Sequence, residues 1–556
     1  MIVLGITHPI SWSTGACLLI DGKLVAMVEE ERLNRIKFAP RIFPSLSIQW
    51  CLDYAGITLD QVDYVGVGFE RPWDTIWPNI VADQPFYYKV LAAGYMALHN
   101  TSNMFKIPAE IRRKNPIFVN HHVSHANSVF YCSQFDEANV ISLDGTGGSN
   151  AGLIGHAHDT KLDIFRTVAN SDSWGNMYAQ ITKLLGFKPH QDEYKVMGLA
   201  SFGNPDPKLL PFINWDGEIP VIDRKRYRDY RAWMTQTVDT KEPMNQHSQD
   251  IAATCQATYE KVTERMLEFL IKKTGSRNLC MSGGSALNCT NNGKLIRSGL
   301  VDEIAVQPAS WDAGTALGAA IQVHIDKTGK RPEVGFDHAY WGPEFGNDQI
   351  EKAIKEHGGV RNWRRSDDVC KETAKLLAEN KVIGWYQGRQ EVGPRALGNR
   401  SILGNPKNPE MKDLINMKVK GREPWRPFAP SILEEYAAEY MEGYSPSPYM
   451  LMTFMAKADK RDEIISATHV DGTCRPQAVS KRTNPRYWTL IDEFRQLTGV
   501  PVVLNTSFNL SDEPNVCTPQ NALETFYRCG LDCLVMGDFI IEKTKDDYCG
   551  APKLRK

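Results

Sequence analysis

The sequence predicts an α/β protein of two domains. At 556 residues, the chain is longer than the roughly 250–300 residues that one hydrophobic core usually supports. Short apolar segments alternate with longer segments of helical periodicity along most of its length. Between residues 325 and 360 the composition turns polar and rich in Gly and Pro, as in Thr328–Pro332 and Trp341–Pro343. Such a stretch is typical of a linker, so we expect one domain over residues 1–345 and a second over residues 360–556.

Two similar groups of strands are predicted in the first domain. Three short strands joined by tight turns open the chain, at Ile2–Ile6, Ala16–Ile20 and Leu24–Val28. A strand, a glycine-rich turn and a second strand return at Val140–Leu143, Asp144–Gly148 and Ala151–Gly155. Two such groups are typical of the duplicated α/β halves of the actin, sugar-kinase and Hsp70 superfamily, in which facing turns bind a nucleotide. Two unrelated hairpins explain the repeat equally well.

Helices and glycine-containing turns are predicted in the rest of the chain. A long helix is expected over Gln249–Thr274, and Gly283 and Gly284 follow near the end of a predicted strand. Glycines at such a place let backbone N–H groups approach a ligand closely. The second domain opens with the strand Val382–Tyr386 and alternates strands and helices as far as Leu534–Met536. This alternation predicts a separate α/β domain.

The composition argues against several classes of protein. A formal net charge of -2 gives no general attraction to nucleic acid or to a membrane surface. The first residues lack the basic start and long apolar stretch of a signal peptide, and no apolar run approaches the eighteen or so residues of a membrane span. The twelve cysteines include no C-x-x-C pair, as expected of buried free thiols. We therefore expect a cytoplasmic protein with neither nucleic-acid nor membrane partners.

A candidate metal site is predicted from two histidines and two aspartates. His121 and His125 are four residues apart, so on a helix both imidazoles lie on one face at a distance suited to chelation. Asp144 at a strand end and Asp312 at a helix start are the acidic residues that we add. Two imidazoles and two carboxylates suit Fe(II), Mn(II) or Zn(II). The alternatives are ordinary histidines, a turn-forming Asp144 and a helix N-cap at Asp312.

Cationic residues are dense in the glycine- and proline-containing loops of the second domain. They are Arg395, Lys420, Arg422, Arg426 and Arg475. The polar segment Leu504–Asn509 follows them. Arginine donates bidentately to phosphate and carbamoyl oxygens, and Ser and Asn add neutral donors. A solvated basic face is the alternative, although prolines and aromatic residues hold these arginines in loops and not along a charged helix.

Five segments of the chain stand out as motifs: Glu29–Arg32 with Arg35 and Lys37, His121–Ala126, Asp192–Ala200, Gly393–Leu403 and Leu504–Asn509. They resemble motifs of the carbamoyltransferase family that includes nodulation-factor, cephem-antibiotic, aminoglycoside, ansamycin and alkaloid-toxin enzymes. The resemblance covers essentially the whole chain.

The resemblance implies a fold and a set of site residues. The N-terminal domain is expected to be actin-like and similar to the tRNA threonylcarbamoyl-transfer protein (TsaD-like), and the C-terminal domain to be similar to YrdC, which makes an acyl-adenylate. The implied metal ligands are His121, His125, Asp144 and Asp312, with Fe(II) the expected metal. The residues expected to hold carbamoyl-adenylate are Lys37, Ser173, Gly283, Gly284 and Asn288. Those expected to bind ATP and carbamoyl phosphate are Arg395, Lys420, Arg422, Arg426, Arg475, Asn505, Ser507 and Asn509.

The activity that this resemblance implies is ATP-dependent O-carbamoyl transfer. ATP, with Mg, and carbamoyl phosphate would give carbamoyl-adenylate, and the carbamoyl group would pass to a hydroxyl of a small natural product such as an antibiotic or a toxin. Enclosed transfer makes physical sense because such a mixed anhydride hydrolyses readily. The alternatives are a carbamoyl-adenylate enzyme that modifies a tRNA or a protein, and an actin-like small-molecule kinase. A homodimer is compatible with each of these.

Two positions depart from the pattern of the family. Trp12 and Ser13 stand where the family commonly has a His-Asp pair, and Asp512 stands where a glycine is usual. Neither an indole nor an unactivated serine hydroxyl is a base near neutral pH. His8, four residues before Trp12, therefore joins Asp144 and Lys37 as a candidate catalytic residue, although a loop histidine without a role explains it equally well.

Overall fold

The computed structural model describes residues 1–71 and 107–544, apart from 207, 209–211, 216, 241, 243, 336 and 424. The chain divides into two compact units. The first comprises Met1–Glu31 and Phe38–Phe336, and the second comprises Arg32–Lys37 and Asp337–Lys556. The short segment Arg32–Lys37 thus packs with residues far along the chain. Within the second unit, for example, Arg32 Nη2 donates to the carbonyl of Gly393 at 2.7 Å.

The first sheet of the first unit has five strands in the order β3-β2-β1-β4-β5. β1 pairs antiparallel with β2 and parallel with β4, β3 is antiparallel to β2, and β5 is parallel to β4. Asp21 and Gly22 form the predicted β2–β3 turn with φ angles of 51° and 79°, as a two-residue hairpin favours. The bounds are β1 Ile2–Ile6, β2 Gly15–Ile20, β3 Lys23–Glu29, β4 Tyr64–Val67 and β5 Ile117–Phe118.

The second sheet has the same strand order and the same pairing directions, as β8-β7-β6-β11-β12. The predicted glycine-rich turn lies partly inside β6, which continues to Gly147 through an irregularity after Leu143. Asp144 therefore projects from an interrupted strand and not from a free turn. The bounds are β6 Glu137–Gly147, β7 Asn150–His158, β8 Lys161–Ala169, β11 Asn278–Ser282 and β12 Glu303–Val306.

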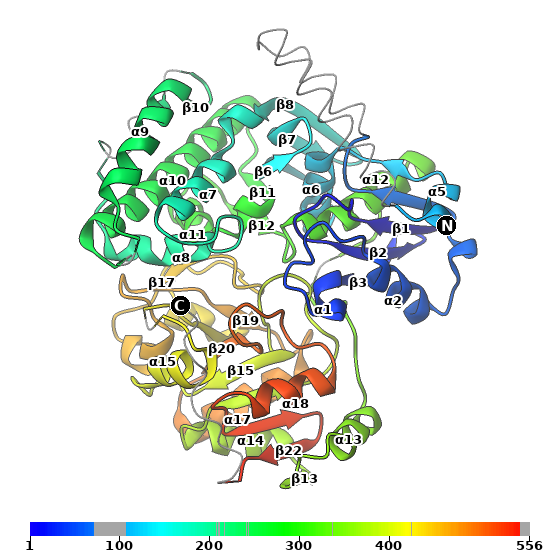
Figure 1. Cartoon of the computed structure of the whole chain (residues 1–556), viewed down its shortest axis with the longest axis vertical. Helices are drawn as coiled ribbons and strands as arrows, with labels where there is room; N and C mark the ends of the chain where they lie inside the picture. The colour runs from blue at the N-terminus through cyan, green and yellow to red at the C-terminus, as the bar shows by residue number, and fades with distance from the viewer. Residues whose placement is uncertain are drawn as a thin grey trace. The chain divides into compact units, whose positions relative to one another are not determined.

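Two helices, α6 (His121–Phe130) and α12 (Thr315–Thr328), lie between the two sheets of the first unit (Figure 1). α6 packs on β6 and β11, α12 packs on β1 and β4, and the two helices pack on each other. The close approach requires Gly318, because a Cβ atom there would lie 1.7 Å from the carbonyl oxygen of Ser124. The N-terminal ends of both helices are thereby held beside the sheets.

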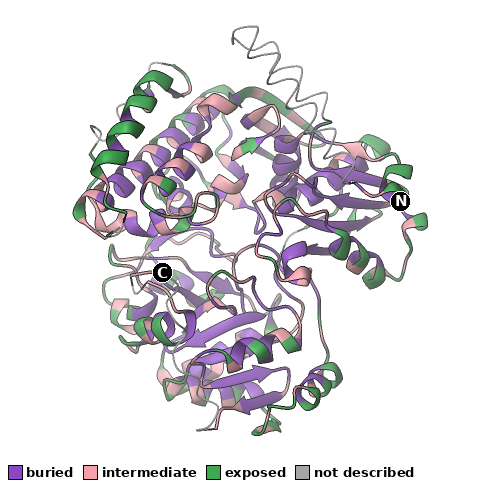
Figure 2. Cartoon of the chain, in the orientation of Figure 1, coloured by how far each residue is buried: buried purple, intermediate pink, exposed green. Residues whose placement is uncertain are grey.

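Three helices of the first unit, α7 (Trp174–Leu184), α8 (Glu193–Leu199) and α11 (Cys289–Arg297), pack on α10 (Gln246–Thr274). The predicted long helix is confirmed, but it begins at Gln246 because the Asn245 side chain caps it by accepting the Ser248 N–H at 2.9 Å. Figure 2 shows that α9 is largely exposed whereas α10 buries one face. The bounds are α1 Glu30–Asn34, α2 Ser45–Ala55, α5 Ala109–Arg113, α7 Trp174–Leu184, α8 Glu193–Leu199, α9 Arg224–Thr237, α10 Gln246–Thr274 and α11 Cys289–Arg297.

An eight-stranded sheet forms the centre of the second unit, in the order β13-β22-β21-β14-β15-β20-β16-β19. The predicted strands at both ends of this region are confirmed as β14 and β21, which pair parallel. α13 (Asn347–Glu356) and α18 (Pro519–Tyr527) enclose a core on one side with Ile354, Leu523 and Leu534. The strand bounds are β13 Trp363–Arg365, β14 Ile383–Tyr386, β15 Arg400–Gly404, β16 Ala429–Leu433, β19 Gln477–Val479, β20 Val502–Ser507, β21 Cys533–Met536 and β22 Phe539–Glu542.

Further helices and a small sheet complete the second unit. α14 and α17 pack on each other, and α17 also packs on β16 and β20. A helical turn, Ile415–Lys420, carries the cationic Lys420. The bounds are α14 Val369–Ala378, α15 Met411–Leu414, α16 Ala437–Tyr440, α17 Pro485–Thr498, β17 Phe454–Met455 and β18 Thr473–Cys474.

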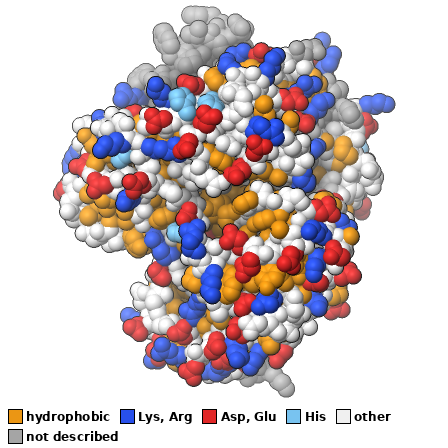
Figure 3. All heavy atoms as spheres, turned by 180° about the vertical axis from the view of Figure 1, so that it is seen from behind, with side chains coloured by type: hydrophobic (Ala, Val, Ile, Leu, Met, Phe, Trp, Pro, Cys, Tyr) orange, Lys and Arg blue, Asp and Glu red, His pale blue; other side chains and the backbone are white. Residues whose placement is uncertain are grey.

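The surface charges and the cysteines of the described residues are as the composition predicts. Lys and Arg side chains are interspersed with Asp and Glu over the face shown in Figure 3. Each described cysteine is a free thiol, and nearly all of them are buried. Among the described residues, no helix combines the length and apolar character needed to cross a bilayer.

Candidate metal centre and basic cluster

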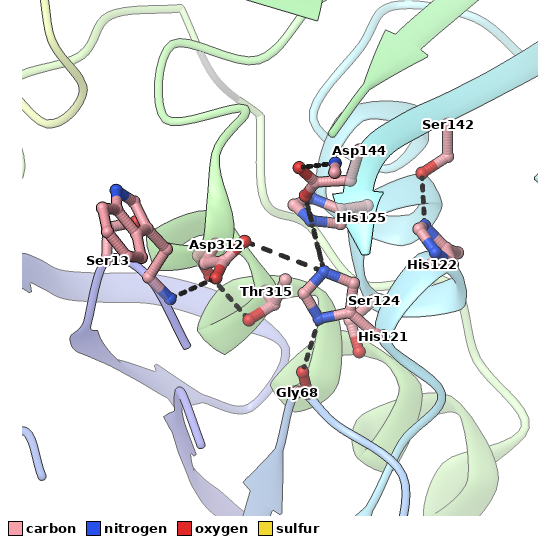
Figure 4. Close-up of polar contacts among 12 residues, drawn as sticks. Ser13, Gly68, His121, His122, Ser124, His125, Ser142, Asp144, Asp312 and Thr315 are labelled. Atoms are coloured by element: carbon pink, nitrogen blue, oxygen red, sulfur yellow. Dashed lines mark hydrogen bonds and ion pairs between the residues drawn. The ribbon is translucent and has the colours of Figure 1, made fainter. Parts of the chain in front are cut away.

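His121, His125, Asp144 and Asp312 meet at one point of the first unit. One nitrogen or oxygen atom of each lies within 4.8 Å of those of the other three. His121 Nε2 is 3.1 Å from His125 Nε2, 3.6 Å from Asp144 Oδ2 and 3.8 Å from Asp312 Oδ1. His125 Nε2 is 3.2 Å from Asp144 Oδ2. The structure thus brings together all four residues predicted as ligands (Figure 4).

Three elements position these side chains. The Asn120 side chain accepts the Val123 N–H at 3.0 Å, which caps α6 so that His121 is its first residue. The two histidines of the cluster then lie one helical turn apart on the same face. Asp144 comes from the irregular part of β6. Asp312 opens a short 3₁₀ turn that leads into α12.

Backbone groups orient the ligands. His121 Nδ1 lies 3.3 Å from the Gly68 carbonyl oxygen, so Nδ1 carries the hydrogen and the Nε2 lone pair faces the cluster when the ring is neutral. The Trp12 N–H donates to Asp312 Oδ2 at 2.6 Å, and Ser13 Oγ accepts the Ala313 N–H at 3.1 Å. The Trp12 backbone therefore holds the Asp312 side chain, and the Ser13 side chain holds the backbone that follows it.

Charge is distributed unequally over the four residues. Burial disfavours a charged His121, but its hydrogen bond to Asp144 and the charge of Asp312 raise its pKa to about 9. Burial and the nearby His121 lower the pKa of His125 to about 4. Burial opposes the charge of Asp144, yet hydrogen bonds from both histidines hold its pKa well below the usual range. Burial and the charge of Asp144 raise the pKa of Asp312. Without a metal ion, the raised pKa values of His121 and Asp312 both reduce the net negative charge of the cluster.

This donor set fits a divalent metal ion. Two imidazole Nε2 atoms at 3.1 Å cannot both carry a hydrogen, and the two carboxylates bring more negative charge than one imidazolium neutralises. A divalent cation in place of the proton would accept lone pairs from all four residues and balance both carboxylates. Mixed nitrogen and oxygen ligands suit Fe(II), Mn(II) or Zn(II).

The cluster is bordered by further side chains, which were not predicted from the sequence. Glu70 accepts a hydrogen bond from the capping Asn120 at 2.6 Å, and its charge contributes to the raised pKa of His121. His122 Nε2 is 3.0 Å from a carbonyl oxygen of β7. The ring of His190 lies 5.5 Å from that of Trp12. Only His122 carried a local signal, because it follows His121; the others reach the cluster through tertiary structure.

Three of the residues expected to hold carbamoyl-adenylate lie around Asp144. Ser173 Oγ donates to the Gly145 carbonyl at 2.6 Å and caps α7. A Cβ atom at Gly284 would lie 3.1 Å from Asp144 Oδ1. Gly283 has a φ of 82° and packs against the backbone of β6, so a side chain is excluded there. Ser173 and the backbone at Gly283 and Gly284 thus lie close to Asp144 or to the strand that carries it.

The other two residues of that expected set lie elsewhere. Asn288 caps α11 and donates to Gln256 Oε1 at 2.9 Å. Lys37 ends the segment that packs with the second unit, and its charge is one of those that lower the pKa of Lys420. The structure therefore groups Lys37 with the cationic residues of the second unit.

His8 is buried, with 2% of its surface exposed. Its ring lies 5.3 Å from that of Phe69, and its Nδ1 accepts the Ile10 N–H at 3.3 Å. In the neutral ring Nε2 then carries the hydrogen and acts as a donor. A role as proton acceptor requires the other tautomer.

Lys420 is the centre of a basic cluster in the second unit. It is 4% exposed, and its Nζ donates to Asn509 Oδ1 at 2.8 Å and to the Ser507 carbonyl. Burial, followed by the charges of Arg422 and Arg426, holds its pKa well below the usual range. No acidic side chain among the described residues pairs with Lys420. Such a concentration of positive charge favours an anionic ligand.

Two arginines flank Lys420. Arg422 Nε donates to Asn416 Oδ1 at 2.6 Å, and its guanidinium lies 4.7 Å from the centre of the Phe428 ring. Arg426 is paired with Glu423 at 3.4 Å, and only 14% of its side chain is exposed. The prediction that loops and aromatic contacts hold these arginines in place is thus confirmed for Arg422 by its geometry.

The remaining predicted residues, Arg395, Arg475 and Asn505, also lie in the second unit. Arg395 is half-buried on the loop that follows Gly393, whose φ is 89°. Asn505 is 1% exposed, and its Nδ2 donates to the Ala396 carbonyl at 3.1 Å. Arg475 is half-buried between β18 and β19. Asn505 therefore supports the loop that carries Arg395.

Family comparisons cover nearly the whole chain. The family described as Carbamoyltransferase N-terminus matches residues 3–321, and that described as Carbamoyltransferase C-terminus matches residues 374–543. Nodulation protein NolNO of Sinorhizobium fredii is 39% identical over 547 residues, which are 95% of this chain and 79% of that protein. Nodulation protein NolO of Bradyrhizobium diazoefficiens is 40% identical over 436 residues, 76% of this chain and 79% of that protein.

Among solved structures, the alignment with HypF of T. kodakarensis covers 60% of this chain and 48% of the HypF chain. The two are 13% identical, and the TM-score is 0.36. The two family matches and the relatives rest on sequence, and together they span both compact units. The chain belongs to the carbamoyltransferase family and is a carbamoyltransferase.

Proposed function

We propose that this carbamoyltransferase is ATP-dependent, forms carbamoyl-adenylate, and transfers the carbamoyl group to a hydroxyl of a small natural product. The observation that carries the proposal is the presence of two chemically opposite sites in one chain. The first unit holds a cluster of imidazoles and carboxylates, which suits a metal cation. The second holds a buried lysine beside arginines, which suits phosphate groups.

The basic cluster is proposed to form the adenylate. Water and carbamoyl phosphate give carbamate and phosphate; a carbamate oxygen then bonds to the α-phosphorus of ATP, and pyrophosphate leaves. Lys420, Arg422, Arg426 and Arg395 would bind and orient the phosphate groups, with Mg bound to ATP. Buried, fixed cations stabilise the developing charge better than mobile exposed ones because they need no reorganisation. Ser507 and Asn509, which hold Lys420 Nζ, would set its direction.

The first unit is proposed to perform the transfer. The acceptor oxygen bonds to the carbamoyl carbon, the bond from that carbon to the adenylate oxygen breaks, AMP leaves, and the hydroxyl proton is lost. His121, His125, Asp144 and Asp312 would hold Fe(II) or another divalent metal, which would supply Lewis acidity. Ser173 and the backbone at Gly283 and Gly284, which border Asp144, would position the carbamoyl group.

The fold supports this division of labour. We infer that residues 1–345 form a duplicated actin-like, TsaD-like domain, because both five-stranded sheets of the first unit have one strand order and one set of pairing directions. Residues 360–556 are proposed as a YrdC-like domain. Its support is the Lys-x-Arg pair at Lys420 and Arg422, together with the Ser-x-Asn pair at Ser507 and Asn509.

A base is needed for the acceptor proton, and His8 remains the proposed residue. It would have to release the Ile10 N–H from Nδ1 or reach the proton through another group. A pH–rate profile of the transfer step in the parent and in His8→Asn tests this role. Loss of a limb near the histidine reference pKa of about 6.5 supports it, whereas an unchanged profile eliminates it.

The nucleotide product separates this proposal from a kinase. The full chain is incubated with ATP, Mg and carbamoyl phosphate, and the nucleotides are resolved by chromatography. Pyrophosphate is expected because carbamate displaces it from ATP, and the nucleotide expected beside it is carbamoyl-adenylate, or AMP once the carbamoyl group has been lost to water or to an acceptor. Formation of ADP would contradict the scheme. Acceptors are then sought in a panel of hydroxylated natural products by mass spectrometry of the carbamoylated product.

A further inference from the structure

A buried glutamate of the second unit holds the loop that carries Arg395. Glu391 is 2% exposed. One of its oxygens, Oε1, accepts three backbone N–H groups, those of Leu397 at 2.8 Å, Asn399 at 2.7 Å and Arg400 at 3.1 Å. Three donors on one carboxylate oxygen form an anion-binding arrangement of the backbone around a side chain of the same loop. These three hydrogen bonds hold residues 397–400 close to the Glu391 carboxylate.

The rest of this loop is equally constrained. The one remaining N–H of the segment, that of Gly398, donates to Ser401 Oγ at 3.0 Å. The Leu397 carbonyl accepts from Tyr340 OH at 2.8 Å and from Gln477 Nε2 at 2.7 Å. Gly398 has a φ of 98°, and a Cβ atom there would lie 2.1 Å from the Tyr487 ring. Hydrogen bonds and close packing therefore hold this loop from several sides.

The charge of Glu391 is stabilised by peptide groups and not by a cation. In the part of the chain that the structure describes, Glu391 has no ion pair, and its Oε2 is buried without a hydrogen-bond partner. The nearby Arg400 is also fully buried, and its guanidinium donates to carbonyl oxygens, including that of Gln387 at 2.6 Å. Burying an unpaired carboxylate is unfavourable. Its presence therefore indicates a requirement on the geometry of this loop beyond stability.

We propose that Glu391 is a positioning residue for carbamoyl-adenylate formation, holding the Arg395 loop in the conformation that binds ATP or carbamoyl phosphate. This inference rests on the proposed function. Arg395 stands one residue before Ala396, whose carbonyl is itself held by Asn505. Without the three bonds to Glu391, the loop would sample other conformations and Arg395 would spend less time in the binding geometry. Glu391 itself touches neither substrate.

The test compares Glu391→Gln and Glu391→Ala with the parent. Gln keeps an acceptor oxygen of the same reach but removes the charge, so its fold is retained, whereas Ala removes all three bonds. We expect the KM for ATP or carbamoyl phosphate to rise about 10-fold in Glu391→Gln and more in Glu391→Ala, with a smaller change in kcat. Transfer from supplied carbamoyl-adenylate should stay unchanged in Glu391→Gln. Glu372→Gln is the matched control, because Glu372 lies at the surface of the same unit, paired with Arg364.

The outcomes are distinguishable. A rise in KM confined to adenylate formation, with parental thermal stability in Glu391→Gln, supports the positioning role. Equal losses in both half-reactions would show a purely structural role and overturn it, as would parental kinetics in Glu391→Gln. Absence of AMP and pyrophosphate from the parent would instead overturn the proposed function itself.

Discussion

The cluster in the first unit and the cluster in the second unit differ in how their charges are balanced. In the first, Asp144 pairs with His121 and His125, so charges of both signs meet within a few ångströms. In the second, Arg422 and Arg426 surround a buried Lys420 whose hydrogen-bond partners are neutral. The first site combines two imidazoles with two carboxylates and suits a cation, and the second has positive charge in excess and suits an anion. The contrast indicates two different half-reactions.

Removing a histidine ligand is expected to have the largest effect. His121→Ala and His125→Ala should each lower metal content and carbamoyl transfer about 100-fold or more, because one of four ligands is lost. Adenylate formation should continue. Elemental analysis and a transfer assay measure these effects. His158→Ala is the control, since His158 is partly exposed and pairs with Asp163 on β8. Full metal occupancy in either cluster variant would make the ligand assignment wrong.

The opposite phenotype is expected in the second unit. Arg395→Ala and Lys420→Met should lower adenylate formation about 100-fold, since each removes a fixed donor from the phosphate site. Metal content and transfer from supplied carbamoyl-adenylate should be retained. Release of pyrophosphate measures adenylate formation. Lys412→Met is the control, because burial also lowers the pKa of Lys412 although it lies outside the cluster. Equal loss of both half-reactions would erase the contrast between the sites.

Metal affinity should depend on pH. The raised pKa of His121, about 9 without metal, means that metal must displace a proton from a site that is protonated below that value. Apparent affinity should therefore increase as the pH rises toward 9, by about tenfold per unit for one displaced proton. Competition with a fluorescent chelator over this range measures it. A flat profile would show that the displaced proton is not on the cluster.

A small effect is expected at Asp512. Its φ of 63° lies in the left-handed region, which glycine adopts freely and other residues adopt at a cost. Asp512→Gly should change the free energy of unfolding by about 1 kcal/mol at most, whereas Asp512→Val should destabilise by about 1–2 kcal/mol. Chemical denaturation measures both. A large destabilisation in Asp512→Gly would show that the Asp side chain itself supports this loop.

Local sequence patterns predicted the parts of the sites that depend on one element. His121 and His125 were predictable because helical spacing alone puts them together, and the hairpin at Asp21 and Gly22 because its turn chemistry is local. Asp312 lies nearly two hundred residues away, and only the packing of α12 against α6 brings it to the histidines. Its local signal was its place at a predicted helix start, and the resemblance to a family added the role of metal ligand.

The grouping of Lys37 illustrates what local patterns omit. The sequence predicted two continuous domains joined by a single linker. That prediction does not allow for a segment of the first domain that packs with the second unit, as Arg32–Lys37 does. The same holds for Glu391, whose role depends on three backbone donors that follow it in a folded loop. A glutamate two residues before a glycine carries no sequence signal for such an arrangement.

The most direct test of the two-site account is selective removal of the metal from the full chain. A chelator specific for transition metals is applied, excess Mg is retained, and pyrophosphate with carbamoyl-adenylate is measured beside the carbamoylated product. Adenylate formation should persist while carbamoyl transfer disappears, and added Fe(II) should restore transfer. Loss of both activities together, or persistence of transfer in metal-free protein, would contradict the assignment of separate half-reactions to the two clusters.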